Sequence, residues 1–361
     1  MRRALCPLLI ALTPIASAGA APAARVETAV PGTAAPFLAA GAAWYAAASR
    51  TGSVSFFAAG TGAPAGQIEL KEGIAACPVA LEDRLAVPLA GGGVDLLSAP
   101  DGRLVARIPT GAQVPHLAVS AVGFLVAEPE GAVSLIDPAT GSARWRTLVA
   151  SAPSAPPTLC GTQVLVGTAQ GGMIALAPDD GRLLWSERLG GPITSPVTCD
   201  GRRAWVGSSD NQLHAFKPGR RGLRRLWAFH TGGDVLSRPI IHREVLLFFS
   251  YDTYLYALKA RNGHLSWKAR LGRRPQAESL ISGELLLVAP LNAERLDIFR
   301  VADGAQAGSL TLPAGVERLV TPPVAMGESF LIGIARYGEE SSRIAQLDPR
   351  DLLAPTVASP P

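Results

Sequence analysis

A unit of about forty residues recurs along the chain, and this repetition restricts the possible folds more than any other feature of the sequence. The unit is clearest at residues 164–185, where an apolar run, a polar turn, a second apolar run, a glycine turn and a tryptophan follow one another. Related units start near residues 124, 204 and 246, and weaker ones extend toward both ends. Short apolar runs bounded by turn residues predict β-strands. We therefore expect an all-β protein built from stacked copies of one small sheet.

Two further markers recur with the unit. The glycine turns lie at Gly62, Gly102, Gly141, Gly181, Gly222, Gly263 and Gly304, followed by an eighth turn at Asp348-Pro349. The residues that open the units are Pro36, Pro78, Pro115, Pro157, Pro196, Pro239, Ser279 and Pro323. Proline is tolerated at the first residue of a strand. Four strands in each unit are typical of a β-propeller blade. The sequence predicts an eight-bladed propeller over residues 25–351, with four antiparallel strands per blade; seven blades are the alternative, because the end units are degraded.

One tryptophan occupies the same place in four consecutive units, shortly after the glycine turn. These residues are Trp145, Trp185, Trp227 and Trp267, spaced by 40, 42 and 40 residues. Four copies at one repeat position favour a common packing role between neighbouring blades, with Gly141, Gly181 and Gly263 as turn positions of the same repeat. A row of aromatic rings that stacks on a ligand is the alternative.

The last unit lacks an obvious fourth strand, so either terminus can complete it. Residues 25–30 supply it in the interpretation that we favour, because an N-terminal strand closes the ring and removes a free sheet edge. Residues 352–357 are the alternative; otherwise residues 352–361 form a C-terminal tail.

The first twenty residues have the organisation of a secretory signal peptide. Arg2 and Arg3 precede the apolar core Leu8–Leu12, and small residues offer cleavage sites at residues 16–18 and 18–20. The sequence therefore predicts an exported, periplasmic protein with no transmembrane segment in the mature chain. Cys6 lies before the apolar core and is not placed as a lipoprotein cysteine.

Three cysteines remain beyond the signal peptide: Cys77, Cys160 and Cys199. Cys160 and Cys199 occupy the same position in neighbouring units. A disulfide needs Cα atoms within about 7 Å, and we expect equivalent points on adjacent blades to be farther apart. Two buried thiols are therefore predicted, with a disulfide as the alternative.

Positive charge is concentrated in the fifth and sixth units. Residues 202–274 contain fifteen Lys and Arg against four acids, a net charge of +11, and the rest of the chain beyond residue 20 has a net charge of −9. The candidate contacts for a partner are Arg220, Arg221, Arg224, Arg225, Arg273 and Arg274. Such a patch attracts an acidic protein face or an anionic membrane surface. The alternative is an ordinary solvated surface, and export argues against nucleic acid.

The string from Asp137 to Trp145, Asp-Pro-Ala-Thr-Gly-Ser-Ala-Arg-Trp, resembles the repeat of pyrroloquinoline-quinone-type propellers, D-x-x-T-G-x-x-x-W. The Asp-Gly-Arg-Leu-Leu-Trp string ending at Trp185 is similar to it. Proteins with this repeat fall into two branches that matter here. One contains quinone-dependent dehydrogenases, and the other contains scaffold propellers of the BamB type from the outer-membrane β-barrel assembly machinery. The chain is similar to the second branch in length, export signal and lack of appended domains, but departs from it by lacking a lipobox cysteine after the apolar core.

No catalytic, cofactor-binding or metal-binding residue is assigned. The dehydrogenase branch needs a carboxylate base and an oxygen-ligated calcium ion, and its alcohol dehydrogenases add an adjacent Cys-Cys pair that this chain lacks. Asp210, Asp234 and Asp252 fall in turns, where Asp usually bonds to local backbone. The five histidines fall in different units without metal-ligand spacing. The predicted function is a non-enzymatic periplasmic scaffold without a cofactor, monomeric within a complex of envelope proteins. A quinone-dependent dehydrogenase and a secreted glycan-binding propeller are the alternatives.

Overall fold

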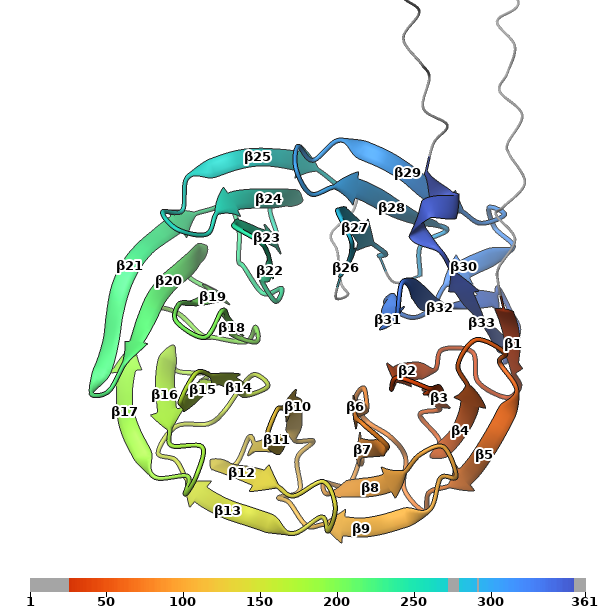
Figure 1. The fold of residues 1–361 in the computed structure, drawn as a ribbon, viewed down its shortest axis with the longest axis horizontal. Coiled ribbons are helices and arrows are strands. Elements are labelled where there is room, and N and C mark those ends of the chain that lie inside the picture. Colours follow the sequence, from red (N-terminus) through yellow and green to blue (C-terminus); the bar gives the residue numbers. More distant parts are fainter. Residues whose placement is uncertain (1–25, 272–278, 291, 354–361) are drawn as a thin grey trace, which may run out of the picture.

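Eight antiparallel sheets stand around a common axis in the computed structural model, which describes residues 26–271, 279–290 and 292–353 (Figure 1). In seven of them, four strands that are consecutive in the sequence pair with one another from the axis outward. This confirms the eight-bladed propeller and excludes seven blades. The expected signal peptide lies outside the described residues.

The first four blades follow one another without interruption. Blades 1 and 2 consist of β2 (Phe37–Ala40), β3 (Trp44–Ala48), β4 (Ser53–Ala58), β5 (Pro64–Glu69), β6 (Val79–Leu81), β7 (Arg84–Pro88), β8 (Val94–Ser98) and β9 (Leu104–Ile108). Blades 3 and 4 consist of β10 (His116–Ser120), β11 (Gly123–Glu128), β12 (Ala132–Ile136), β13 (Ala143–Leu148), β14 (Thr158–Cys160), β15 (Gln163–Gly167), β16 (Gly172–Leu176) and β17 (Leu183–Arg188).

Blade 8 differs from the others because it contains both ends of the described chain. Blades 5 to 7 consist of β18 (Thr198–Cys199), β19 (Ala204–Ser208), β20 (Gln212–Gly219), β21 (Gly222–His230), β22 (Ile240–His242), β23 (Val245–Phe249), β24 (Tyr254–Lys259), β25 (Leu265–Arg270), β26 (Leu280–Ser282), β27 (Leu285–Val288), β28 (Arg295–Arg300) and β29 (Gln306–Thr311). Blade 8 contains β31 (Val324–Met326), β32 (Ser329–Arg336), β33 (Ser342–Leu347) and β1 (Val26–Val30), with β30 (Glu317–Leu319) added beside β32.

The middle strands of the blades are buried on both faces, because each blade packs between two others. β11, β12, β15 and β19 are buried at every residue, which explains why they are continuous apolar runs without alternation. The outermost strands β13 and β17 alternate between exposed and buried residues, because they face solvent on one side.

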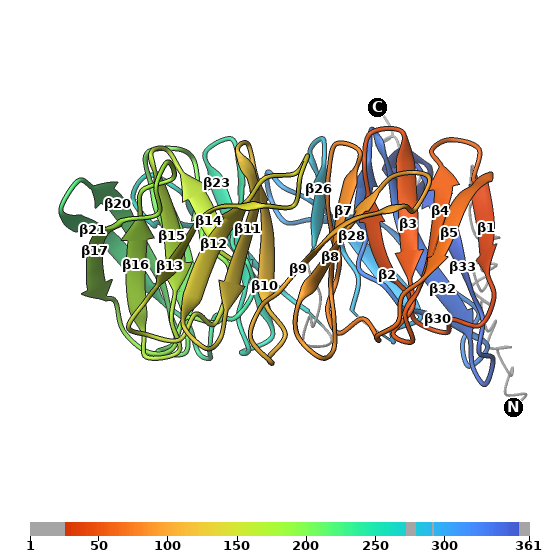
Figure 2. The same cartoon turned by 90° about the horizontal axis from the view of Figure 1, so that it is seen from below.

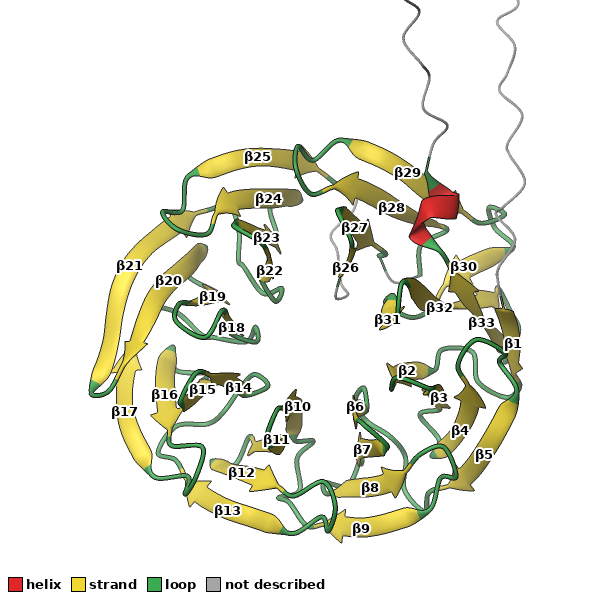
Figure 3. Ribbon diagram, viewed as in Figure 1, coloured by secondary structure: helices red, strands yellow, loops and turns green. Residues whose placement is uncertain are grey.

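The antiparallel connections divide the turns between two rims of the disc (Figures 2 and 3). We call one the connector rim, since it carries the segments that join successive blades and the turns between second and third strands. The opposite rim carries the turns between first and second strands and between third and fourth strands. The opening prolines directly precede the first strands and therefore lie at the connector rim.

The N-terminal strand closes the ring, as the sequence predicted. β1 pairs with β33 from Val26↔Gln346 to Val30↔Ser342. The hydroxyl groups of Thr28 and Tyr45 lie 2.6 Å apart, which ties β1 to blade 1 as well. The C-terminal end follows another course: after the short helix η1 (Pro349–Leu352), Leu353 forms a bridge with Gly308 of blade 7.

The prediction of two separate thiols at Cys160 and Cys199 is wrong, because the two residues form a disulfide with Cα atoms 5.6 Å apart. They end β14 and β18, which are first strands. Neighbouring blades converge toward the axis, so their first strands lie much closer together than their outer strands do. The Thr158 hydroxyl also donates to the carbonyl oxygen of Val197 at 2.9 Å. The disulfide therefore joins blades 4 and 5 at their inner edges.

Deletion of residues 25–30 is expected to lower the melting temperature, because it exposes the edge of β33 and removes the Thr28–Tyr45 contact. Differential scanning calorimetry measures this. Glu27→Ala is the control, since it removes only the ion pair of an exposed Glu27 with Arg343. An unchanged melting temperature after the deletion would show that β1 does not hold the ring closed.

Replacement of both Cys160 and Cys199 by Ala is expected to lower the free energy of unfolding by about 3–4 kcal/mol. The cysteines are 39 residues apart in the sequence, and closing a loop of this size restricts the unfolded chain by about that amount. Urea unfolding measures the difference, with Cys77→Ser as control. Equal stability of the double variant and the wild type would contradict a stabilising link between the blades.

Candidate functional site

A long hairpin on the outside of blade 5 contains four of the candidate partner-binding arginines (Figure 1). β20 and β21 have 8 and 9 residues, whereas the corresponding strands of blade 4 have 5 and 6. The hairpin closes through the pair Gly219↔Gly222, which places Arg220 and Arg221 at its tip. The two extra residues between Trp185 and Trp227 thus lengthen this hairpin and turn the usual loop into a tight two-residue turn.

Three of these arginines have exposed side chains without a hydrogen bond or ion pair within the described residues: Arg220, Arg221 and Arg224. Arg225 differs from them, because its guanidinium donates to the carbonyl oxygens of Arg188 at 2.6 Å and Leu189 at 3.1 Å. Arg225 therefore attaches the hairpin to the end of β17, and the other three remain available to a partner.

A second contact fixes the hairpin to blade 4 close to its tip. The carboxylate of Glu187 accepts a hydrogen bond from the backbone N–H of Leu223 at 2.9 Å. Together with Arg225, this contact holds β21 beside β17. The basic tip is thus presented by a supported hairpin.

Arginines elsewhere in the ring are mostly paired with carboxylates. Arg107 bonds to the buried Asp95 at 2.7 Å, Arg146 to the buried Glu128 at 3.0 Å, and Arg343 to Glu317 at 2.6 Å. The bond from Arg343 also lowers the pKa of Glu317 below its ordinary value. Arg220, Arg221 and Arg224 of blade 5 differ from these arginines, because they have no carboxylate partner among the described residues.

The opposite rim of blades 5 and 6 adds further cations to the hairpin. Arg202 lies in the turn between β18 and β19, and Arg261 in the turn between β24 and β25. Both are exposed, and neither side chain has a partner in the described part of the chain. We define the basic rim as Arg202, Arg220, Arg221, Arg224 and Arg261.

Arg273 and Arg274 lie outside the described residues. The residues that flank them, Leu271 and Ser279, follow β25 and precede β26, and both lie at the connector rim. The chain therefore enters and leaves this segment on the rim that faces away from the Arg220–Arg221 tip. The part of the predicted patch formed by Arg273 and Arg274 therefore stays a prediction.

The repeated tryptophans pack against the glycine turn of the following blade. The Trp145 indole N–H donates to the carbonyl oxygen of Pro178 at 2.8 Å, and that of Trp185 donates to Gly219 at 2.9 Å. A Cβ added at Gly181 would lie 2.4 Å from the Trp145 ring. Gly181 also has a φ of +71°, a conformation that favours glycine.

The residue that faces the glycine turn, and its hydrogen bonds, differ in other blades. Gly263 packs against the ring of Trp227, whose indole nitrogen is buried without a hydrogen bond among the described residues. Gly141 has Ala106 of blade 2 in the place of a tryptophan, and its added Cβ would lie 2.3 Å from the Cβ of Ala106. Close approach of the glycine turn is thus common to blades with and without the aromatic ring.

The turn aspartates of blades 5 and 6 bind local backbone and one side chain each. Asp210 accepts from the Gln212 N–H at 3.1 Å and lies 2.9 Å from His214 Nε2. Asp252 accepts from the Tyr254 N–H at 3.1 Å and from the Tyr256 hydroxyl at 2.6 Å. Burial alone would raise the pKa of Asp252, but its hydrogen bonds hold that pKa below its ordinary value.

These contacts connect the turns to the segments between blades. The Gly232 N–H donates to Asp252 Oδ2 at 2.9 Å, and the Ser208 hydroxyl donates to the Gly191 carbonyl oxygen at 2.9 Å. Asp234 lies in the connector beside them, where its carbonyl oxygen accepts from the Tyr251 N–H at 2.9 Å. No group of three or more His, Cys, Asp or Glu residues placed to hold a metal ion occurs within the described ranges.

Comparison with known proteins agrees with this repeat architecture. A family model described as outer membrane protein assembly factor BamB, of the pyrroloquinoline-quinone repeat type, matches residues 129–284, which include all four tryptophans of the row and the blade-5 hairpin. The chain is thus a β-propeller that resembles BamB, with repeats of the pyrroloquinoline-quinone type in the matched residues.

Solved structures show the same fold at low sequence identity. BamB from Moraxella catarrhalis matches with a TM-score of 0.70 and 17% identity, over 86% of this chain and 96% of that chain. The computationally designed Ika8 protein matches with a TM-score of 0.73 and 11% identity, over 90% and 99%. Saccharomyces cerevisiae Sqt1 matches with a TM-score of 0.72 and 12% identity, over 89% and 98%. Proteins this distant from BamB share its architecture, so function has to be argued from the surface of this chain.

No curated protein matches the sequence. Within the residues that the structure describes, no helix has the length and apolar character needed to cross a membrane.

Substitution of Trp185 by Ala is expected to lower the free energy of unfolding by about 3–5 kcal/mol, because a buried aromatic ring and its link to blade 5 are lost together. Denaturant unfolding measures the effect. Leu183→Ala in the same strand is the control: its side chain is 57% exposed, and we expect a change within about 0.5 kcal/mol. Similar small effects of both substitutions would argue against a packing role for the tryptophan.

Proposed function

We propose that the protein is an exported, non-enzymatic scaffold that binds the acidic face of an envelope protein through the basic rim. The observation that carries the proposal is the set of exposed arginines at the blade-5 hairpin that have no internal partner. Rigid presentation of such charges favours specific and rapid association with a complementary surface. Binding would need little further ordering of the hairpin, because Arg225 and Glu187 already attach it to blade 4.

The disulfide supports export to an oxidising compartment. Structural disulfides persist in the periplasm and outside the cell and are rare in the cytosol. The Cys160–Cys199 bond therefore agrees with the signal-peptide pattern at residues 1–20. We infer that the mature chain works in the periplasm or at the periplasmic face of the outer membrane.

The resemblance to BamB suggests the class of partner. BamB is described as an outer membrane protein assembly factor, and we propose a component of the β-barrel assembly machinery as the first candidate partner. The protein would act as a monomer within that complex, without a cofactor. Peripheral contact of the basic rim with anionic lipid is compatible with the same charges.

The proposal is tested by crosslinking in intact cells, affinity purification and mass spectrometry. Wild-type protein is expected to recover β-barrel assembly components. Arg220→Glu combined with Arg221→Glu is expected to reduce that recovery about tenfold or more, because both charges at the hairpin tip are reversed. Binding should also weaken as salt is raised from about 0.05 to 0.5 M, since exposed charges are screened.

A matched control keeps the same change in net charge. Arg103→Glu combined with Arg270→Glu alters two exposed arginines away from the basic rim, in blade 2 and at the connector rim of blade 6. Recovery should remain at the wild-type level. Equal recovery with both double variants would remove the basic rim from the proposal, and failure to recover any envelope protein with the wild type would overturn the scaffold.

Arg273 and Arg274 remain candidate contacts and form a separate arm of the experiment. Reversal of this pair alone should reduce recovery only if the partner also contacts Arg273 or Arg274. The dehydrogenase alternative is checked by dye reduction in the presence of pyrroloquinoline quinone and calcium, and the glycan alternative by retention on envelope polysaccharide. Activity or retention without a protein partner would replace the scaffold with that function.

A further inference from the structure

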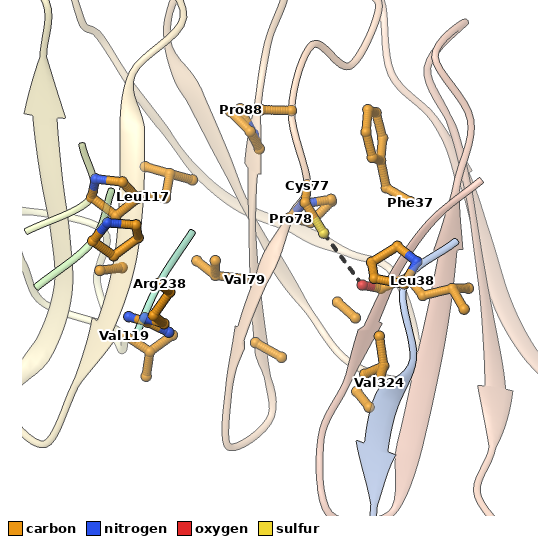
Figure 4. A pocket seen from close by; sticks show the side chains of 18 of the residues that line it. Phe37, Leu38, Cys77, Pro78, Val79, Pro88, Leu117, Val119, Arg238 and Val324 are labelled. Atoms are coloured by element: carbon orange, nitrogen blue, oxygen red, sulfur yellow. Dashed lines mark hydrogen bonds between the residues drawn. The ribbon is translucent and has the colours of Figure 1, made fainter. Parts of the chain in front are cut away.

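A channel with a volume of about 1060 Å³ runs along the axis of the ring (Figure 4). Residues of seven first strands or of the segments just before them line it, and blade 6 contributes Arg238, which precedes β22. The lining includes the whole of β10 and its two flanks, from Pro115 at the connector rim to Ala121 at the opposite rim. The channel therefore extends between the two rims, with a wall made by the inner edges of the blades.

Most of the residues that line this channel have apolar side chains. Prolines of the opening position surround it at the connector rim: Pro36, Pro78, Pro115, Pro157, Pro196 and Pro323. Farther along, Val79, Leu117 and Val324 face the same space (Figure 4). Val119 is 42% exposed although it belongs to a first strand, because its side chain faces the channel.

Some polar side chains of the wall have partners within the fold, whereas the Ser279 hydroxyl is buried without a hydrogen bond among the described residues. The Thr158 hydroxyl donates to Val197, and the Cys77 thiol donates to the carbonyl oxygen of Leu38 at 3.4 Å. Polar side chains are a minority of the described lining, so a sugar or another polyhydroxylated ligand would find few side-chain partners for its hydroxyl groups here. An apolar chain has no hydroxyl groups to leave unpaired, and the burial of its surface against the wall would favour binding.

The charged groups of the described lining are cationic. Arg238 is exposed and has no partner among the described residues, and Arg50 lies with its guanidinium carbon 4.7 Å from the centre of the Phe37 ring. Both belong to segments at the connector rim, on blades 6 and 1. His116 is the third titratable group, and its burial lowers its pKa. No Asp or Glu is found among the described residues that line the channel.

We propose that the channel binds an amphiphile with one apolar chain and an anionic head group. The chain would lie along the valine, leucine and proline wall, and the head group would meet Arg238 and Arg50 at the connector-rim mouth. A charge-assisted hydrogen bond from guanidinium to carboxylate fixes the orientation, and the volume is sufficient for a ligand of this size. This site is separate from the basic rim and does not depend on the scaffold function.

The probe for the test is laurate, used below its critical micelle concentration, with binding followed by isothermal titration calorimetry. The wild type is expected to bind one laurate per chain. Arg238→Gln combined with Arg50→Gln should weaken laurate binding about tenfold. Dodecyltrimethylammonium, which has the same chain length and a cationic head, should bind the wild type more weakly than laurate does.

Two further variants locate the site. Ala325→Trp places a large ring at an exposed channel position of β31 and should abolish laurate binding. Arg261→Gln is the matched control, because it removes the same charge from the same blade at the opposite rim and should leave binding unchanged. Circular dichroism and thermal unfolding of each variant verify that the propeller is intact, and Val119→Glu serves as a second blocking variant if Ala325→Trp does not fold.

Three results would overturn the proposal. The first is an absence of laurate binding to the wild type. The second is wild-type binding by the folded blocking variant, which would place laurate outside the channel. The third is equal affinity for laurate and dodecyltrimethylammonium, with no effect of the arginine substitutions, which would show that the arginines do not select the head group.

Discussion

The contact between one blade and the glycine turn of the next is the interaction on which the rest of this structure depends. Gly181 lies directly on the ring of Trp145, and Gly219 accepts a hydrogen bond from Trp185. A side chain at Gly181 would push the two blades apart, so the repeat needs a residue without a Cβ at that point. Each blade buries little surface alone, and the ring becomes stable only because this contact recurs from blade to blade.

Closure of the ring imposes a second requirement, since a linear array would expose two free edges. β1 meets it by pairing with β33 from the other end of the described chain. The disulfide between β14 and β18 adds a covalent link at the inner edge, where the blades converge. With the scaffold fixed in this way, individual turns can vary without loss of the fold, and the blade-5 hairpin is the clearest example.

The basic rim and the channel mouth differ in what surrounds their arginines. In blades 2, 3 and 8 an arginine is paired with a buried carboxylate, as in Arg107–Asp95. The basic rim and the channel mouth both contain arginines without such partners, but the first is open to a protein face and the second is enclosed by apolar wall. The first therefore fits a large acidic surface, whereas the second fits a narrow ligand with a single anionic group.

The repeat and the strand order within a blade could be read from the sequence, because both depend on local turn chemistry and apolar patterning that recur every forty residues or so. The sequence favoured eight blades and closure by the N-terminal strand, but it left seven blades and a C-terminal strand as alternatives, and the structure resolved both. The lengthened hairpin is also visible in the sequence, because Trp185 and Trp227 are 42 residues apart whereas the other neighbours in the row are 40 apart. Tertiary structure alone decided which equivalent residues meet. It brought Cys160 to Cys199, since the blades converge at the axis. The fold places Arg220 and Leu271 on opposite rims, and the hydrogen bonds of Arg225 to blade 4 support the hairpin. The apolar channel is likewise invisible in any single repeat, because its wall is assembled from one edge of every blade.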